Sequence, residues 1–336
     1  MPISCFASPE LALNSVRIRV VLATLTIALI APGVVSASPW ATSWQSYDPG
    51  STPVFGYTNP DTALGMPERF TGENEFGGAF ASAVTMFNSA FGTDEVVSIG
   101  EGGHLTLELG TPATNNPSNP YGVDLIIFGN AGFTDSDYPN GTIGSPASLY
   151  GFGFGRIELS ADGVNFFELP GLRADTLFPT QGYQDVDPLS SNPGSIETDF
   201  FKPVNPALTL SDFDGLSYAQ ALALYDGSGG GTPIDIGLVG LSMVTHVRIL
   251  VDDDFNPGTF RSAEIDAITV VPEPASAACL LAAAGCVLLR RGQRRGAAIK
   301  PFVKRVAIGE PISGGIFSAN VARAAGRLHH SGITPR

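Results

Sequence analysis

"GRIELSADGVNFFEL", residues 155–169, is the stretch of this 336-residue chain that decides its fold. Ile157 and Leu159 alternate with charged residues, which is the period of a strand that buries one face and exposes the other. The short run Ala161–Gly163 then supplies an Asp-Gly turn before a second apolar run. The stretch therefore predicts an antiparallel hairpin.

A second stretch, "VVSIGEGGHLTLELG" at residues 96–110, repeats this pattern. Its first strand is predicted over 96–99, its turn over 101–103, and its second strand places alternate leucines on the core side. The stretch "GVDLIIFGN" at 122–130 has a continuous apolar run, which indicates a strand buried on both faces. The residues expected to be buried are Leu105, Leu107, Leu109, Leu125, Ile127, Ile157, Leu159, Val247 and Ile249.

The remaining body, residues 38–270, fits the same class. Val244–Val251 and Glu264–Val271 are predicted as closing strands, and helical periodicity is scarce. We expect an all-β fold, an antiparallel jelly-roll-type β-sandwich with one or two short helices.

Three segments depart from the strand pattern. Apolar residues at helical spacing predict a helix packed on the sandwich; they are Phe76, Phe80, Val84 and Phe87. A short helix is predicted over Ala219–Tyr225, ending at Gly227. The segment 174–211 is rich in proline and polar residues and is predicted to be a long loop over the surface.

The first 37 residues have the pattern of a secretory signal peptide. Arg17 and Arg19 precede the apolar stretch "VVLATLTIALIAPGVVSA", whose last three residues, 35–37, form a cleavage signal. We expect an N-terminal signal helix that is removed after Ala37. An uncleaved membrane anchor is the alternative, although Pro32 interrupts the apolar segment.

Charge and cysteine content narrow the class of function. Residues 38–289 contain six bases and 30 acids, a net charge of −24. Such a surface repels phosphate, which argues against nucleic acid as a partner and favours cations or neutral polar ligands such as sugars. The three cysteines, Cys5, Cys279 and Cys286, lie in the leader and near the C-terminus. The body therefore has neither a disulfide framework nor a cysteine nucleophile or zinc ligand.

No motif of a known catalytic class is present in the body. The stretches typical of serine hydrolases, zinc proteases and phosphate-binding loops are missing, and His104 and His246 lie on separate predicted strands. We predict a non-enzymatic protein. With this many acids a catalytic carboxyl pair is an open alternative, which would make the protein a secreted carbohydrate-active hydrolase or lyase.

Two acidic loops are candidate calcium sites. Asp252, Asp254 and Asn256 alternate just beyond a predicted strand, and Asp135 and Asp137 lie in a turn-rich loop. Carboxylate and amide oxygens on loops are the ligands that Ca²⁺ prefers. Solvated acidic loops without a metal are the alternative reading.

Three loop tyrosines are candidate ligand-binding residues. Tyr138, Tyr150 and Tyr183 are predicted to lie exposed on loops, where a ring could stack on the face of a sugar. Each could instead cover part of the core.

The C-terminal region 271–295 combines a short motif, an apolar segment and arginines. Pro272-Glu273-Pro274 precedes an apolar segment, 275–289, which is followed by Arg290 and Arg291. We predict an apolar helix that halts in the membrane, with the arginines on the cytoplasmic side. The basic remainder, 296–336, is predicted to be a disordered tail.

This arrangement resembles the PEP-CTERM sorting signal. The resemblance implies recognition and cleavage by an exosortase, a membrane enzyme of Gram-negative bacteria that produce exopolysaccharide. The body also resembles bacterial surface domains of the discoidin, galactose-binding-like type. That second resemblance covers about residues 62–270 and rests on stretches such as 122–130 and 264–270, but Gly129 stands where the pattern has an acid.

Together these features predict an exported protein of the cell envelope, outer surface or extracellular matrix. Its expected partners are the export machinery, signal peptidase, an exosortase and a glycan or exopolysaccharide, with transient insertion in the inner membrane. Calcium is the one cofactor that these sequence patterns suggest. A purely structural envelope protein is a further alternative.

Overall fold

The computed structural model describes residues 37–151, 153, 155–253 and 261–273. The predicted signal peptide before Ala37, the apolar helix over 275–289 and the tail over 296–336 lie outside the described residues.

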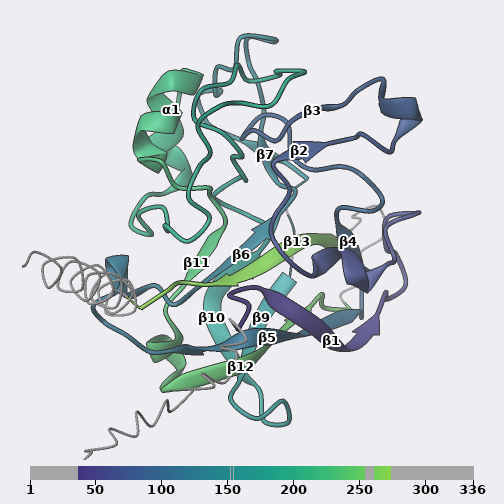
Figure 1. Cartoon of the computed structure of the whole chain (residues 1–336), viewed down its shortest axis with the longest axis vertical. Helices are drawn as coiled ribbons and strands as arrows, with labels where there is room; N and C mark the ends of the chain where they lie inside the picture. Colours follow the sequence, from purple (N-terminus) through teal and green to yellow (C-terminus); the bar gives the residue numbers. More distant parts are fainter. Residues whose placement is uncertain (1–36, 152, 154, 254–260, 274–336) are drawn as a thin grey trace, which may run out of the picture. The chain divides into compact units, whose positions relative to one another are not determined.

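A five-stranded antiparallel sheet forms one layer of the body (Figure 1). Its strands, in spatial order, are β1 (Ala41–Asp48), β5 (His104–Thr114), β12 (Met243–Leu250), β9 (Gly155–Ser160) and β10 (Phe167–Ala174). The hairpin predicted over 155–169 is confirmed, because β9 pairs with β10 in antiparallel register.

A four-stranded antiparallel sheet faces the first (Figure 1). Its order is β11 (Thr232–Ile234), β6 (Leu125–Gly129), β13 (Ser262–Val270) and β4 (Val97–Gly100). The main apolar cluster is made by residues of both sheets. All nine residues predicted to be buried are at most 5% exposed, so the prediction of an antiparallel all-β body with this core is confirmed.

Short elements complete the body. Two small sheets pair β2 (Phe70–Thr71) with β3 (Ser82–Ala83) and β7 (Gly132–Phe133) with β8 (Leu149–Tyr150). The α-helix is α1 (Tyr218–Tyr225), and the 3₁₀ turns are η1 (Pro60–Ala63), η2 (Phe76–Gly78), η3 (Pro120–Gly122), η4 (Leu210–Phe213) and η5 (Ile236–Val239). The helix predicted over 219–225 is confirmed, and it ends at Asp226, whose φ of 49° is left-handed.

The strand β6 is buried on both faces, as its continuous apolar run predicted. Leu125 and Ile127 pack in the main core, whereas Ile126 and Phe128 pack in a second cluster on the opposite face. There the ring of Phe128 lies 5.1 Å from the ring of Phe200. An irregular layer that includes α1 covers this face of the four-stranded sheet (Figure 1).

The segment 174–211 belongs to this irregular layer. It has little regular structure, as predicted, but it is more than a surface loop, because Phe178, Phe200 and Val204 are each at most 4% exposed. Their side chains join apolar clusters with residues of β6, β7 and α1. The segment therefore helps to form the apolar clusters that lie outside the main core, between the four-stranded sheet and the irregular layer.

The predicted hairpin over 96–110 is wrong in its pairing. The strands β4 and β5 form where expected, but they belong to different sheets, and the turn between them crosses from one layer to the other. Glycine permits this crossing. A Cβ on Gly103 would lie 2.6 Å from the carbonyl oxygen of Asp48, and Gly102 has a φ of 74°. Alternation fixes which side chains face the core but does not fix the partner strand.

The helix predicted from Phe76, Phe80, Val84 and Phe87 is also wrong. Gly77 and Gly78 have φ values of 66° and 75°, so the chain leaves helical geometry after one 3₁₀ turn and continues into β3. Phe76 and Phe80 are 73% and 65% exposed, while the other two residues are buried.

Candidate functional site

A cleft opens where the two sheets end side by side. It lies between the edge strands β10 and β11, the turns η3 and η5, and the irregular layer, and it has a volume of about 660 Å³. A hydrogen bond of 3.4 Å from the Thr232 hydroxyl to the Arg173 carbonyl joins the two edges. We call this feature the edge cleft.

The lining of the edge cleft is largely apolar. Tyr121 and Leu238 are 58% and 65% exposed, so the cleft presents two large apolar side chains to solvent. The lining also includes Leu172, Leu177, Leu208, Pro170, Pro206 and Pro233, with Arg173 and Asp235 as the charged groups. A volume of this size with few polar groups is typical of sites for small ligands.

Local backbone features shape this cleft. The pairing of β10 with β9 is irregular between Glu168 and Arg173, where Pro170 cannot donate and Gly171 has a φ of 79°. On the opposite side Tyr121 has a φ of 59° within η3, a conformation that a non-glycine residue rarely adopts. Such conformations gather at functional sites more often than elsewhere.

The edge cleft was missed by sequence reasoning. Its lining comes from four segments separated by tens of residues, and none of them has a periodic signal. The turn "NPYG" at 119–122 was a usable signal, since an aromatic residue between proline and glycine in a turn is exposed.

Buried acids form a separate group along the outer face of β13. Asp175 is 2% exposed, and its carboxylate accepts the backbone N–H of Ala131 at 2.8 Å and of Glu264 at 3.0 Å. Burial, followed by the nearby charge of Glu264, raises the pKa of Asp175 well above its ordinary value. A Cβ on Gly129 would lie 2.3 Å from Asp175 Oδ1, so Asp175 occupies the space that a side chain at position 129 would need.

A second buried acid, Asp266, lies on β13 two residues beyond Glu264. The carboxylate of Asp266 accepts the backbone N–H of Glu68 at 3.1 Å, and burial raises its pKa well above the ordinary value. Burial, with the charges of nearby acids, also raises the pKa of Glu68 to about 7. None of these acids lines the edge cleft. Asp175 and Asp266 accept hydrogen bonds from backbone N–H groups of other segments and so tie loops to the sheet.

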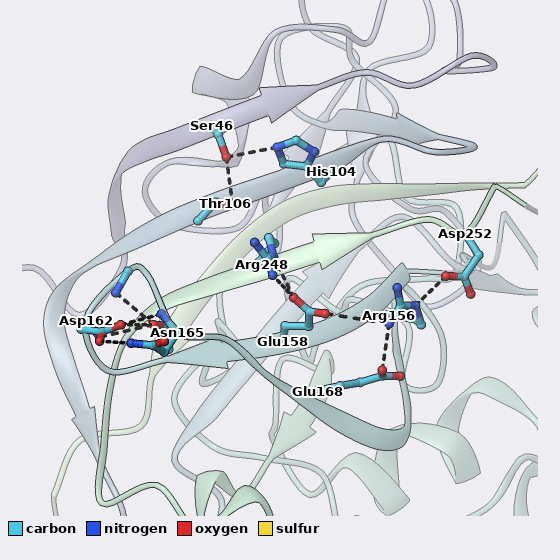
Figure 2. A network of polar contacts seen from close by, with 12 residues as sticks. Ser46, His104, Thr106, Arg156, Glu158, Asp162, Asn165, Glu168, Arg248 and Asp252 are labelled. Atoms are coloured by element: carbon cyan, nitrogen blue, oxygen red, sulfur yellow. Dashed lines mark hydrogen bonds and ion pairs between the residues drawn. The ribbon is translucent and has the colours of Figure 1, made fainter.

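A network of charged residues crosses the outer face of the five-stranded sheet (Figure 2). Arg156 Nε lies 2.6 Å from Asp252 Oδ1, and its Nη1 lies 2.8 Å from Glu168 Oε2. Glu158 pairs with Arg248, whose guanidinium stacks 3.9 Å from the centre of the Phe166 ring. Neighbouring charges alternate in sign, as in a solvated sheet face.

The predicted calcium ligands fall in three situations. Asp252 pairs with Arg156, and Asp254 and Asn256 lie outside the described residues. Asp135 accepts the backbone N–H groups of residues 137, 141 and 142, and Asp137 accepts an amide of Asn140 at 3.2 Å. Within the part of the chain that the structure describes, no three acid, histidine or cysteine side chains converge as metal ligands.

The three predicted tyrosines are not brought together in one pocket. Tyr138 is 76% exposed and lines neither the edge cleft nor the small hollow beside Asp187, whereas the hydroxyl of Tyr150 donates to the Phe87 carbonyl at 3.0 Å. Tyr183 is only 9% exposed, so the expectation of an exposed ring there is wrong. It lies within segment 174–211, where it forms an isolated antiparallel bridge with Glu197 and packs closely against Gly194.

The first two residues of the sorting motif continue the body. The backbone N–H of Val271 donates to the Asp124 carbonyl at 2.9 Å, and its side chain is 5% exposed. Beyond exposed Pro272, the carboxylate of Glu273 accepts hydrogen bonds from Thr114 and Asn116. Pro274, Arg290 and Arg291 lie outside the described residues.

None of the helices that the structure describes combines the length and the apolar character needed to cross a membrane. No protein-family model matches the chain, and no curated protein matches it.

Proposed function

We propose that this is an exported, non-enzymatic protein of the surface or extracellular matrix of a Gram-negative bacterium. In this proposal the jelly-roll-type body of the protein binds a glycan. The edge cleft is the observation that carries the proposal. Its volume of about 660 Å³ and its apolar lining with two charged groups suit a small ligand or a short segment of a polymer.

Sugars match the chemistry of this lining. A pyranose ring presents C–H groups on its face and hydroxyls at its rim, so it can pack on tyrosine, leucine and proline while its rim stays hydrated. Tyr121 and Leu238 offer such surfaces and are left largely exposed by the protein itself. Covering them with a ligand would release the water that now hydrates them.

The acids of the edge cleft support binding rather than glycoside hydrolysis. Hydrolysis generally requires two carboxyl groups on opposite sides of the scissile bond. The carboxylate among the residues lining the cleft is that of Asp235, whose Oδ1 accepts the backbone N–H of Gly237 at 2.8 Å and so caps η5. Buried acids with raised pKa lie elsewhere, at Asp175 and Asp266.

The route to the surface rests on the two ends of the sequence. The N-terminal pattern supports export and cleavage by signal peptidase, and the resemblance of residues 272–291 to a PEP-CTERM signal supports sorting by an exosortase. In the proposed host, a version lacking 274–336 would be released into the medium instead of being retained at the envelope. Retention of that version would overturn the sorting proposal.

Glycan binding is tested by comparing two exposed tyrosines. The chain and its variants would be run against immobilised neutral and acidic polysaccharides, with affinity electrophoresis as the measurement. We expect Tyr121→Ala to lose most of the binding and Tyr138→Ala to keep it, because Tyr138 lies outside the edge cleft. The reverse result would move the site to the loop at 135–142, and binding by no variant or parent would leave a structural protein.

A further inference from the structure

We infer that the edge cleft selects an acidic glycan, with the guanidinium of Arg173 binding the carboxylate of one uronic acid residue. This inference rests on the proposed glycan binding and adds the class of sugar. It concerns one local cation: the body as a whole is acidic and repels polyanions, so the expected ligand is a largely neutral glycan with one carboxylate at Arg173.

The bases of the body are few and mostly paired. Four of the six contact a carboxylate: Arg69 with Glu197 at 3.4 Å, Arg156 with Asp252 at 2.6 Å, Lys202 with Asp226 at 2.7 Å, and Arg248 with Glu158. Arg261 makes an interaction as well. Residues 38–270 carry six bases and 29 acids, so carboxylate partners are easy to find, and this makes an unpaired arginine informative.

Arg173 is the exception. Its Nη1 donates to the carbonyl of Leu172 at 3.3 Å, and no carboxylate lies within ion-pair distance among the described residues. A guanidinium has five N–H donors, so most of its donor capacity is unused by the protein. The side chain lines the edge cleft and is only half-buried, so a ligand can reach it.

The backbone around Arg173 places it at this position. Pairing between β10 and β9 resumes at Arg173 after the irregular stretch that contains Pro170 and Gly171. A bulge of this kind redirects the following side chain relative to the sheet. The carbonyl of Arg173 is also held by Thr232 from the facing edge, so its backbone is fixed from both sheets.

The chemistry of the ligand follows from these neighbours. A guanidinium binds a carboxylate through two parallel hydrogen bonds, which are stronger than bonds between neutral groups. The adjoining leucine, proline and tyrosine surfaces require an apolar face next to that carboxylate. A uronic acid has both features on one ring. Asp235, which lines the same cleft, disfavours a second carboxylate beside the first.

An extended peptide with a terminal carboxylate is a poorer match. Adding a peptide strand to a sheet requires free backbone N–H groups on the edge strand. Pro170 in β10 and Pro233 in β11 remove such donors from both edges that border the cleft. The edges are therefore protected against strand addition, while side-chain recognition of a sugar is unaffected.

The test uses a matched pair of ligands. Short oligosaccharides with one uronic acid residue among neutral sugars would be compared with the same oligosaccharides after reduction of that carboxyl to an alcohol, by isothermal titration with the full chain. We expect the acidic form to bind about tenfold more tightly, as one charge-assisted contact would give. Arg173→Gln should remove this preference while keeping the weaker binding of the neutral form, and Arg173→Lys should restore it only in part.

The control is Lys202→Gln, which also removes one positive charge but lies outside the edge cleft and should keep the preference. Equal affinity for both oligosaccharides would overturn the inference and leave glycan binding standing. A preference that survives Arg173→Gln, or that disappears equally in Lys202→Gln, would overturn it as well. Binding of neither form, or of a short peptide in their place, would overturn the proposed glycan site itself. Thermal melts would confirm that each variant is folded.

Discussion

The carboxylate of Glu95 provides a quantitative test of how the loops are tied to the body. Glu95 is 6% exposed and accepts four hydrogen bonds. Its Oε1 accepts the N–H of Gly72 at 2.9 Å, and its Oε2 accepts the N–H of Phe91 at 3.2 Å, the N–H of Gly92 at 2.8 Å and the hydroxyl of Thr71. The side chain thus joins residues 71–72 to residues 91–92.

Replacing Glu95 with glutamine keeps the shape but removes half of the acceptor capacity. In either orientation of the amide, its NH₂ group faces at least one backbone N–H that was previously bonded. An unsatisfied buried donor costs about 1 to 3 kcal/mol, and each remaining bond loses about 1 kcal/mol when its acceptor is no longer charged. Loss of the repulsion between Glu95 and its neighbours Glu68 and Asp266 offsets part of this. In the better orientation these contributions sum to about 4 to 6 kcal/mol, so with the offset we expect the free energy of unfolding to fall by roughly 3 to 5 kcal/mol.

Urea unfolding followed by the fluorescence of Trp40 and Trp44 measures this change, since both tryptophans lie in the body. The matched control is Glu75→Gln, whose carboxylate accepts from Thr93 at the surface and should shift the midpoint much less. An unchanged midpoint in Glu95→Gln would refute the assignment of these four hydrogen bonds.

The other predictions concern pH, the domain boundary and calcium. The Tm should fall as pH rises from 5 to 8, because burial raises the pKa of Glu68 from its ordinary 4.5 to about 7. The folded state therefore holds the proton more tightly than the unfolded state. The stability gained in this way is fully present below pH 4.5 and is lost as pH rises through about 7. Asp266→Asn should make the Tm depend less on pH, because it removes a second buried acid with a raised pKa. A Tm that rises between pH 5 and 8 would contradict the prediction. Deleting residues 274–336 should leave the Tm unchanged, whereas deleting residues 271–336 should lower it, because Val271 is buried. If both truncated proteins had the same Tm, the C-terminal boundary of the body would lie before Val271. If the predicted acidic loops bind calcium, millimolar Ca²⁺ should raise the Tm and EDTA should lower it. An unchanged Tm in both experiments would show that these loops are solvated and bind no calcium.

Sequence patterns predicted the sandwich far better than its site. Alternation identified buried residues such as Leu107 and Ile157 because a period of two depends only on which face is covered. The same period contains no information on partners, so the crossing between β4 and β5 was read as a hairpin. The helix predicted through Phe76 failed because two glycines with positive φ overrode the apolar spacing.

The edge cleft could not be predicted because it exists only after folding. Tyr121, Arg173, Leu208 and Leu238 come from separate turns and edges, and they become neighbours when β10 and β11 end side by side. Residue type and loop context are the only sequence signals for the predicted tyrosines, and neither determines burial, as the buried Tyr183 demonstrates.

The positions of the last two strands determine when the body can assemble. The strand β12 lies between β5 and β9, and β13 lies between β6 and β4. Each sheet therefore receives an interior strand from the last two strands of the body. A growing chain that has not yet reached residue 243 has neither sheet closed, and the four-stranded sheet still lacks β13 until residues 262–270 are made, so the earlier strands lack the neighbours that bury them. Pairings this distant in sequence form slowly, on a scale of about milliseconds to seconds. Under the proposed export, this order of assembly would keep the polypeptide loosely structured until the body has cleared the inner membrane, so the topology itself would delay folding until translocation is complete.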